Sequence, residues 1–335
     1  MSKGRRIDLG RSATDGLDLV SYGRGGPRTP FSARQIEQLR LTVHRAPEVM
    51  VKVSGGGRDA GGVAAHVRYL DRKGELAIET DDGRVLMGEG AAQALVEDWN
   101  LDVERSAGPV RAGERPAPKQ AHNIVLSMPR RTDPDKLLDA ARGFANRQFG
   151  DRHRYAMVLH TDQDHPHVHL VVKAVSIDGE RLYVRKATLR EWRSDFAEEL
   201  RARGIAANAT PRSIRGATRT PESDGLYRSR TESRSTYDRD RAEQVRKEIE
   251  AGALTPGPGK QRLVESRRAV LAGWQVAAEQ LRSQGEARLA SDVERFAGSL
   301  PPPRTAKERV AAELLAGGAT RESGARQQAP RARSR

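Results

Sequence analysis

The uneven spread of hydrophobic residues along the chain limits its fold more than any other feature. Only 36% of the 335 residues are hydrophobic and 4% are aromatic, which is low for a chain that is packed throughout. Most of the hydrophobic residues lie between Val49 and Ile205. We therefore expect one packed domain over residues 48–210, with more loosely structured regions on both sides.

Within this segment, strand and helix patterns alternate. Apolar residues at every second position predict strands, and apolar residues at spacings of three and four predict amphipathic helices. Asp81-Asp82-Gly83 predicts a hairpin turn, and Thr132-Asp133-Pro134 predicts the start of a further helix. The sequence thus indicates an α/β (α+β) domain with a mainly antiparallel sheet. The predicted strands are 49–53, 122–128, 155–160 and 167–175, and the predicted helices include 59–72, 89–105 and 187–203.

The regions outside this domain are basic and poor in apolar residues. Residues 1–47 are rich in Gly, Arg and Ser and predict a flexible basic N-terminal arm, although Ile36, Leu39 and Val43 form one short helical stripe. After residue 210 the composition changes again. We expect a disordered linker at 211–236, a weakly apolar helical region at 237–316 and a disordered basic tail at 317–335.

Charge and residue usage limit the class of protein. The formal net charge is +14 at pH 7, which favours a polyanionic partner such as a nucleic acid. The chain contains no cysteine, which excludes a disulfide framework and thiolate metal sites. It also has no long apolar run and no signal-peptide pattern, so we expect no membrane span and a cytoplasmic location.

A cluster of histidines predicts a metal site. His167 and His169 would point to the same face of a strand, and His160 would return beside them if its strand pairs antiparallel. Three neutral imidazoles suit a divalent ion such as Mn²⁺, Zn²⁺, Ni²⁺ or Co²⁺ and leave coordination positions open for catalysis. Asp162 or Asp164 could orient a ligand ring. Four of the eight histidines fall within ten residues, namely His160, His165, His167 and His169.

Tyr69 is a candidate nucleophile. It lies roughly 130° from the centre of the apolar stripe of its predicted helix, so it is not expected in the core. A phenol with a pKa of about 10 is a weak nucleophile at neutral pH, and nearby cations favour its phenolate form. Without the histidine cluster, a partly exposed structural tyrosine would be the simpler interpretation. The basic residues beside it are Arg68, Arg72 and Lys73.

Together these segments resemble the relaxases, the mobilization endonucleases of plasmids, and in particular the branch that includes T-DNA border endonucleases. Relaxases belong to the HUH endonucleases, whose signature is similar to His167-Val168-His169. The upstream His-x-Asp of the family resembles His160-Thr161-Asp162, and its tyrosine motif resembles the segment 69–74. A strand that ends in Ser resembles 124–129. The resemblance covers roughly residues 48–210.

The resemblance implies a two-layer domain with helices on one face of the sheet and the active site on the other. It implies that Tyr69 attacks a phosphodiester at a plasmid transfer origin, which gives a 5′-phosphotyrosine link and a free 3′-OH and allows rejoining without ATP. The implied catalytic residues besides Tyr69 are Asp162 and His165. The implied metal ligands are His160, His167 and His169, with Mn²⁺ or Mg²⁺ first and Zn²⁺, Ni²⁺ or Co²⁺ as alternatives.

The expected substrate is single-stranded or supercoiled plasmid DNA. The family also implies relaxosome accessory proteins, a type IV secretion coupling protein and export of the protein bound covalently to DNA. The basic C-terminal tail fits either a secretion signal or a solvated DNA-binding tail. The expected DNA-binding residues are Arg68, Arg72, Lys73, Ser127, Lys173 and Arg185.

Other interpretations stay open at this stage. An HUH-class replication initiator or transposase would use the same chemistry. A metal-dependent hydrolase would use water and leave no protein on the DNA. A non-catalytic DNA-binding accessory protein would explain the charge but not the histidine cluster. Tyr22 and Tyr155 are weaker candidates for the nucleophile, because one lies in the basic arm and the other begins a core strand.

Overall fold

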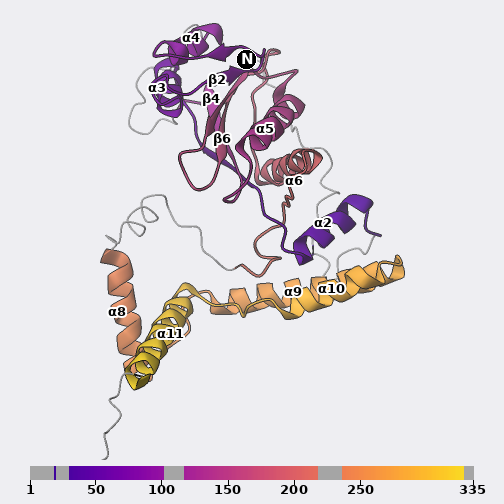
Figure 1. Ribbon diagram of the computed structural model, residues 1–335, viewed down its shortest axis with the longest axis vertical. Helices are drawn as coiled ribbons and strands as arrows, with labels where there is room; N and C mark the ends of the chain where they lie inside the picture. The colour runs from indigo at the N-terminus through magenta and orange to yellow at the C-terminus, as the bar shows by residue number, and fades with distance from the viewer. Residues whose placement is uncertain (1–18, 20–29, 102–116, 218–235, 328–335) are drawn as a thin grey trace, which may run out of the picture. The chain divides into compact units, whose positions relative to one another are not determined.

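The computed structural model describes residue 19 and residues 30–101, 117–217 and 236–327, which form two compact units. The first unit contains the described residues from Ala33 to Thr210. The second contains Leu19, residues 30–32 and the described residues from Pro211 onward. Each unit has its own core, so each is described by itself (Figure 1).

One antiparallel sheet organises the first unit. Its strand order is β1-β4-β6-β5-β2-β3, and each pair of neighbours is antiparallel. The predicted mixed α/β class with a mainly antiparallel sheet is therefore confirmed. The strands are β1 (Met50–Gly55), β2 (Ile78–Thr80), β3 (Val85–Leu86), β4 (Ala121–Ser127), β5 (Tyr155–His160) and β6 (His167–Lys173).

Helices α5 (Pro134–Phe149) and α6 (Lys186–Ala202) cover one face of the sheet (Figure 1). Helix α5 begins at a cap in which the Asp133 side chain accepts from the backbone N–H groups of the first turn. Phe149 of α5 and Trp192 of α6 are buried, and their rings meet edge to face with 5.5 Å between centroids. This aromatic layer packs against the alternate apolar residues of β1, β4, β5 and β6.

The opposite face of the sheet carries helices α3 (Ala60–Leu70) and α4 (Ala91–Asp98), in addition to the predicted helical layer (Figure 1). The predicted apolar stripe of α3 is buried against small residues of β5 and β6, among them Ala156 and Val171. These helices do not reach β1, whose Met50, Lys52 and Ser54 stay exposed on this face. The face is therefore half covered and half open.

Residues 33–47, which were expected within the flexible arm, form part of the first unit. Helix α2 spans Ala33–Val43 and buries Leu39 and Thr42. The Thr42 hydroxyl lies 2.7 Å from that of Thr210, and the Asn208 amide donates to both hydroxyls. This correction has a physical cause, because hydrogen bonds to residues more than 160 positions away hold the helix in place.

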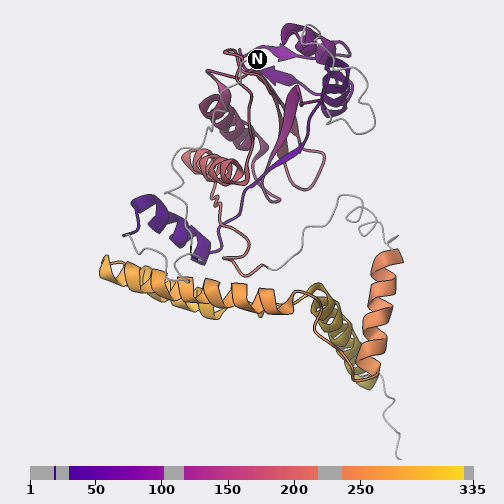
Figure 2. The same ribbon diagram turned by 180° about the vertical axis from the view of Figure 1, so that it is seen from behind.

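The second unit is helical and consists of α8 (Thr236–Glu250), α9 (Lys260–Ser283), α10 (Ala287–Gly298) and α11 (Ala306–Gln327). Figures 1 and 2 show α9 beside α10 and α8 beside α11. Leu19 is fully buried against α9 at Gly273, where an added Cβ would lie 1.8 Å from the Leu19 carbonyl oxygen. The predicted disordered tail is helical as far as Gln327, and the rest of it lies outside the described residues, as does most of the predicted linker.

No helix in the part of the chain that the structure describes is both long enough and apolar enough to cross a membrane.

Candidate active site

Strand pairing brings the three predicted metal ligands together. His160 and His167 are paired residues of β5 and β6, and His169 follows two positions later on the same face. The ring centroids are 4.8 Å apart for His160 and His169 and 5.1 Å apart for the other two pairs. One nitrogen from each ring lies within 4.8 Å of the other two.

The same row of the sheet continues into β4 and β1. Ser127 pairs with His167 on one side and with Met50 on the other. Ser127 is 5% exposed, so it lies beside the triad at the junction between the covered and the open part of the face. The predicted Ser127 is thus part of the site, next to the open β1 surface.

Each of two histidines is fixed through its second nitrogen by a backbone carbonyl. Nε2 of His160 lies 2.7 Å from the Leu70 carbonyl oxygen, and Nδ1 of His167 lies 3.0 Å from the His165 carbonyl oxygen. A carbonyl oxygen only accepts, so these nitrogens carry the hydrogen. Nδ1 of His160 and Nε2 of His167 are therefore left with lone pairs that can bind a metal ion.

Two of the three rings have lowered pKa values. Burial, together with the neighbouring rings of His160 and His167, lowers the pKa of His169 to about 3. Burial also lowers the pKa of His160, against the opposing effect of its bond to the Leu70 carbonyl. Neutral imidazole is the form that binds metal ions, so the environment of His160 and His169 favours the ligand form of both rings. Three such donors fit a divalent ion with open positions.

Helix α3 places the candidate nucleophile next to the triad. The side chain of Asp59 caps the helix by accepting from the Gly62 N–H at 2.6 Å, and the apolar stripe buries one side. Tyr69 lies in the last turn and is 64% exposed, as expected for a residue off the stripe. The next residue, Leu70, gives its carbonyl to His160, so one peptide unit separates the tyrosine from the histidine cluster.

The loop after α3 places the Arg72 side chain over the Tyr69 ring. Arg72, Lys73 and Gly74 have φ values of 55°, 61° and 93°, a left-handed run that costs non-glycine residues about 1 kcal/mol or more each. The Arg72 guanidinium carbon lies 5.9 Å from the Tyr69 ring centroid. Arg72 also forms an ion pair with Asp162 at 2.5 Å. Asp162 is therefore paired on the tyrosine side of the site, and its charge also opposes the lowering of the His160 pKa by burial.

Some predicted residues lie elsewhere or act differently. The His165 side chain is exposed, and it is the backbone carbonyl of this residue that orients His167. Asp164 pairs with Arg130 and not with a histidine. Tyr155 is buried in the core, and burial raises its pKa, so its environment disfavours the nucleophile role. Tyr22 lies outside the described residues.

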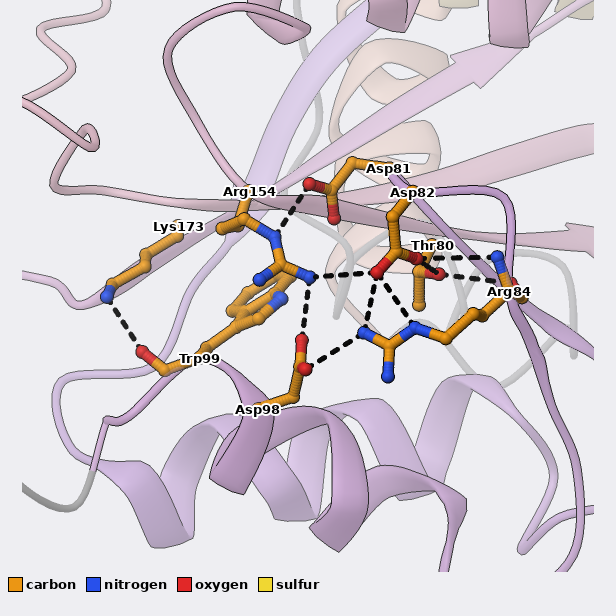
Figure 3. Close-up of polar contacts among 8 residues, drawn as sticks. All are labelled: Thr80, Asp81, Asp82, Arg84, Asp98, Trp99, Arg154 and Lys173. Carbon is orange, nitrogen blue, oxygen red and sulfur yellow. Dashed lines mark hydrogen bonds and ion pairs between the residues drawn. The ribbon is translucent and has the colours of Figure 1, made fainter.

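The predicted DNA-binding residues fall into two groups. Arg68 and Lys73 are exposed at the end of α3, close to Tyr69. Lys173 is at the opposite end of β6 from His167 and donates to the Trp99 carbonyl at 2.7 Å (Figure 3). Arg185 precedes α6 on the other face of the sheet, with its guanidinium 5.0 Å from the centroid of the Tyr183 ring.

The sequence analysis missed Asn123 and His66. Asn123 is 2% exposed on β4 and contacts His169. His66 lies one turn before Leu70 on α3 and contacts the Asn123 side chain. The available signals were weak. Asn123 faces the same side of its strand as Ser127, and His66 lies four residues before Leu70, whose carbonyl contacts His160.

Part of the chain is similar to a known family of nucleases. Residues 81–204 match the family model of the relaxases, MobA/VirD2-like, nuclease domain. The matched range contains the three histidines, and Tyr69 precedes it. The resemblance that the motifs predicted is therefore confirmed for the nuclease domain.

The chain is also similar to individual relatives. It is 27% identical over 190 residues to the T-DNA border endonuclease VirD2 of Rhizobium radiobacter, which covers 53% of this chain and 45% of that protein. It is 24% identical over 151 residues to the 43 kDa relaxation protein of Salmonella typhimurium, which covers 42% of this chain and 39% of that protein. The chain thus spans about half or less of the length of these relatives.

A solved structure described as "Molecular Basis of Vancomycin Resistance Transfer in Staphylococcus aureus" aligns with 49% of this chain and 98% of its own, at 14% identity. The TM-score of 0.33 is too low to establish a shared fold.

Proposed function

We propose that this chain nicks one strand of plasmid DNA at a transfer origin, with Tyr69 as the nucleophile, in conjugative transfer or mobilization. One observation carries the proposal: the helix that presents an exposed tyrosine is joined to a cluster of three histidines by the bond between the Leu70 carbonyl and His160. The match to a relaxase nuclease domain supports the same reaction class.

The reaction is a transesterification. The Tyr69 oxygen attacks the phosphorus, the new bond joins tyrosine to the 5′-phosphate, and the bond between phosphorus and the 3′-oxygen breaks. The tyrosine loses its phenolic proton, and the departing 3′-oxygen takes up a proton to become a 3′-OH. His160, His167 and His169 would hold a divalent ion, which would supply positive charge to the phosphate oxygens. Because the phosphotyrosine keeps the energy of the ester bond, the reverse reaction rejoins the strand.

The chain's own charged residues prepare the tyrosine. The Arg72 guanidinium carbon lies 5.9 Å from the centroid of the Tyr69 ring, and we propose that this contact positions the ring for attack. Asp162 holds Arg72 in that position and is the carboxylate that we propose to receive the phenolic proton. His165 keeps an exposed imidazole in the same loop, where we propose that it exchanges protons with the leaving 3′-oxygen.

The ligand atoms of the triad indicate which metal ion it would bind, and the exposed β1 part of the sheet face indicates where DNA would lie. Imidazole nitrogens suit Mn²⁺, Zn²⁺, Ni²⁺ or Co²⁺ better than Mg²⁺, which prefers oxygen ligands, so we propose Mn²⁺ before Mg²⁺. We propose that single-stranded DNA crosses the open β1 part of the face beside Ser127, with Arg68, Arg72 and Lys73 on the phosphates. Relaxosome proteins and a secretion coupling protein would be further partners.

The test is a covalent-adduct assay. The full chain is incubated with Mn²⁺ and single-stranded DNA from its plasmid's transfer origin, and the products are separated on a denaturing gel. We expect a protein–DNA adduct that is lost in Tyr69→Phe and in His167→Ala. Tyr237→Phe is the matched control, because Tyr237 is also exposed, at 58%, but lies on α8, and it should keep the adduct.

Other outcomes would replace the proposal. An adduct that survives Tyr69→Phe would move the nucleophile to another residue. Cleavage without an adduct would indicate a hydrolase that uses water. DNA binding without cleavage, with each of the divalent ions tested, would indicate a non-catalytic accessory protein. An adduct on a replication origin alone would favour a replication initiator.

A further inference from the structure

The third histidine of the triad is held differently from the other two. His169 has no carbonyl at its second nitrogen; instead, Nδ1 lies 3.4 Å from Oδ1 and 3.3 Å from Nδ2 of Asn123. Asn123 is 2% exposed, and its Nδ2 donates to the Ser54 hydroxyl at 2.6 Å. An amide can accept with its oxygen or donate with its nitrogen. The orientation of this amide therefore decides which nitrogen of His169 carries the hydrogen.

Only one of the two orientations gives a metal ligand. If Oδ1 of Asn123 accepts from Nδ1–H of His169, Nε2 of that ring keeps its lone pair and can bind a metal ion. If Nδ2 donates to Nδ1, the hydrogen of the neutral ring is on Nε2, which then cannot bind. The bond from Nδ2 to the Ser54 hydroxyl uses one of the two amide hydrogens, and Oδ1 is the acceptor that the Asn123 side chain offers to Nδ1–H of His169.

The pattern of the other two rings supports this orientation. His160 and His167 each give their second N–H to an oxygen, that of Leu70 or His165. An Asn123 oxygen on His169 would complete a set in which all three rings donate to oxygen acceptors and keep one bare nitrogen each. The three bare nitrogens would then be available to one ion.

His66 connects this arrangement to the tyrosine helix. It contacts the Asn123 side chain, and its buried Nε2 has no hydrogen-bond partner among the described residues. His66 and Leu70 are four residues apart, so they lie on the same side of α3. Helix α3 therefore reaches the triad before and after Tyr69: through His66 to Asn123, and through the Leu70 carbonyl to His160.

We propose that Asn123 is a positioning residue that holds His169 in its Nδ1–H form as a metal ligand, and that His66 keeps Asn123 in place from α3. This inference rests on the proposed metal site, and it adds that the helix carrying the nucleophile also orients the metal ligands. The packing of α3 against the sheet and the orientation of the histidine ligands thus depend on the same contacts.

Two substitutions separate the accepting role from simple packing. Asn123→Leu keeps approximate size but removes the acceptor, and we expect the affinity for Mn²⁺, measured by calorimetry on the full chain, to fall 10- to 100-fold, as is typical of such orienting residues. Asn123→Asp keeps an accepting oxygen, and we expect an affinity within about threefold of the unmodified protein or tighter. Circular dichroism establishes that each variant is folded.

A buried asparagine elsewhere gives the matched control. Asn208 is 1% exposed in the same unit and bonds to Thr42 and Thr210, not to a histidine. We expect Asn208→Leu to lower the melting temperature without changing the affinity for Mn²⁺. The inference is overturned if folded Asn123→Leu binds Mn²⁺ as tightly as the unmodified chain, or if Asn123→Asp loses as much affinity as Asn123→Leu.

A measurement on the unmodified, metal-free chain needs no variant to fold. Long-range ¹H–¹⁵N NMR spectra of ¹⁵N-histidine-labelled protein report which nitrogen of each ring carries the hydrogen. We expect Nδ1–H for His169, and Nε2–H for His169 would overturn the inference. If the chain bound no Mn²⁺ at all, the metal part of the proposed function would fail, while the NMR result would still decide the role of Asn123.

Discussion

The two ends of the β5–β6 pair satisfy their polar groups in opposite ways. At one end, burial lowers the pKa values of His160 and His169, and the rings of His160 and His167 each give one N–H to a backbone carbonyl. At the other end, Arg154 binds Asp81 and Asp98, each at 2.6 Å. The histidine end keeps free lone pairs, whereas the arginine end forms pairs of opposite full charges.

The network at the arginine end extends into the β2–β3 hairpin and α4. Arg84 binds Asp82 at 2.7 Å and Asp98 at 2.9 Å (Figure 3), and the Thr80 hydroxyl donates to Asp82. Three carboxylates and two guanidinium groups thus join the start of β5, the hairpin and the end of α4. The arginine end thus joins elements of the sheet and of the covering helix α4 through ion pairs within the chain, while the histidine end keeps nitrogens that could bind an ion.

The largest expected effect concerns the metal. At a concentration of 100 times its dissociation constant, a bound ion stabilises the folded state by about 2.7 kcal/mol, so Mn²⁺ should raise the melting temperature of the first unit. His167→Ala removes one of three ligands and should lower the affinity by more than about 100-fold, which abolishes that rise. Thermal unfolding with and without Mn²⁺ measures it. An equal rise in His167→Ala and in the unmodified chain would place the metal elsewhere.

Removing Arg154 should lower the stability of the fold and leave metal binding unchanged. Arg154→Ala removes the cation that both Asp81 and Asp98 bind at 2.6 Å, while Asp98 keeps its ion pair with Arg84. The two carboxylate side chains are only 15% and 28% exposed. We expect a loss of about 1–3 kcal/mol in the free energy of unfolding and an unchanged affinity for Mn²⁺. Urea unfolding followed by tryptophan fluorescence measures the loss, in a Trp274→Phe background so that the signal comes from the first unit.

Arg142→Ala is the control for a less buried pair. The Arg142 side chain is 48% exposed and bonds to Glu79, so solvent screening should limit its loss to about 1 kcal/mol or less. If Arg154→Ala cost no more than Arg142→Ala, the arginine end would not be a stabilising network. If it lowered the Mn²⁺ affinity, the two ends would not be independent.

The histidine end was predictable because its signals are local. The spacing of His167 and His169 fixes a common face of one strand, and His160 is joined to them by a six-residue connection between paired strands. The position of Tyr69 off the apolar stripe followed from helix geometry alone. Each inference needed only residues that are close together in the sequence.

The rest depends on contacts between distant residues of ordinary type. The Leu70 carbonyl and His160 are 90 positions apart, and a backbone carbonyl leaves no mark in the sequence. Arg154 and Asp98 are 56 positions apart in a chain with 31% charged residues, where no single pair is distinctive. The cover of α3 and α4 was likewise missed, because an apolar stripe shows that a helix is buried but not on which face of a sheet.

Histidines away from the triad should make the first unit sensitive to acid. Burial, together with the charges of Lys119 and Arg181, lowers the pKa of His122 to about 4. In the unfolded chain this ring takes up a proton below pH 6.5, so stability falls as the pH drops from about 6.5 to 4. The contribution of His122 at pH 5.5 should be about 1 kcal/mol.

Urea unfolding at pH 7 and pH 5.5 measures this contribution. His122→Gln should reduce the loss of stability between the two values, and His165→Gln, which removes an exposed ring, should leave the loss unchanged. An equal loss in His122→Gln and in the unmodified chain would show that other groups carry the acid sensitivity.

The smallest expected effect tests where the DNA lies. Arg68 is exposed on α3 beside Tyr69, and Arg152 is exposed just before β5, at the arginine end. If single-stranded DNA binds at the histidine end, Arg68→Ala removes one phosphate contact and should reduce the salt dependence of binding by about 0.7 in log–log slope. Arg152→Ala should leave that slope unchanged, because its charge is at the far end. Fluorescence anisotropy between low and moderate salt measures both slopes. Equal reductions in the two variants would mean that DNA binds through the overall positive charge of the chain. In that case the histidine end would not be the DNA-binding site.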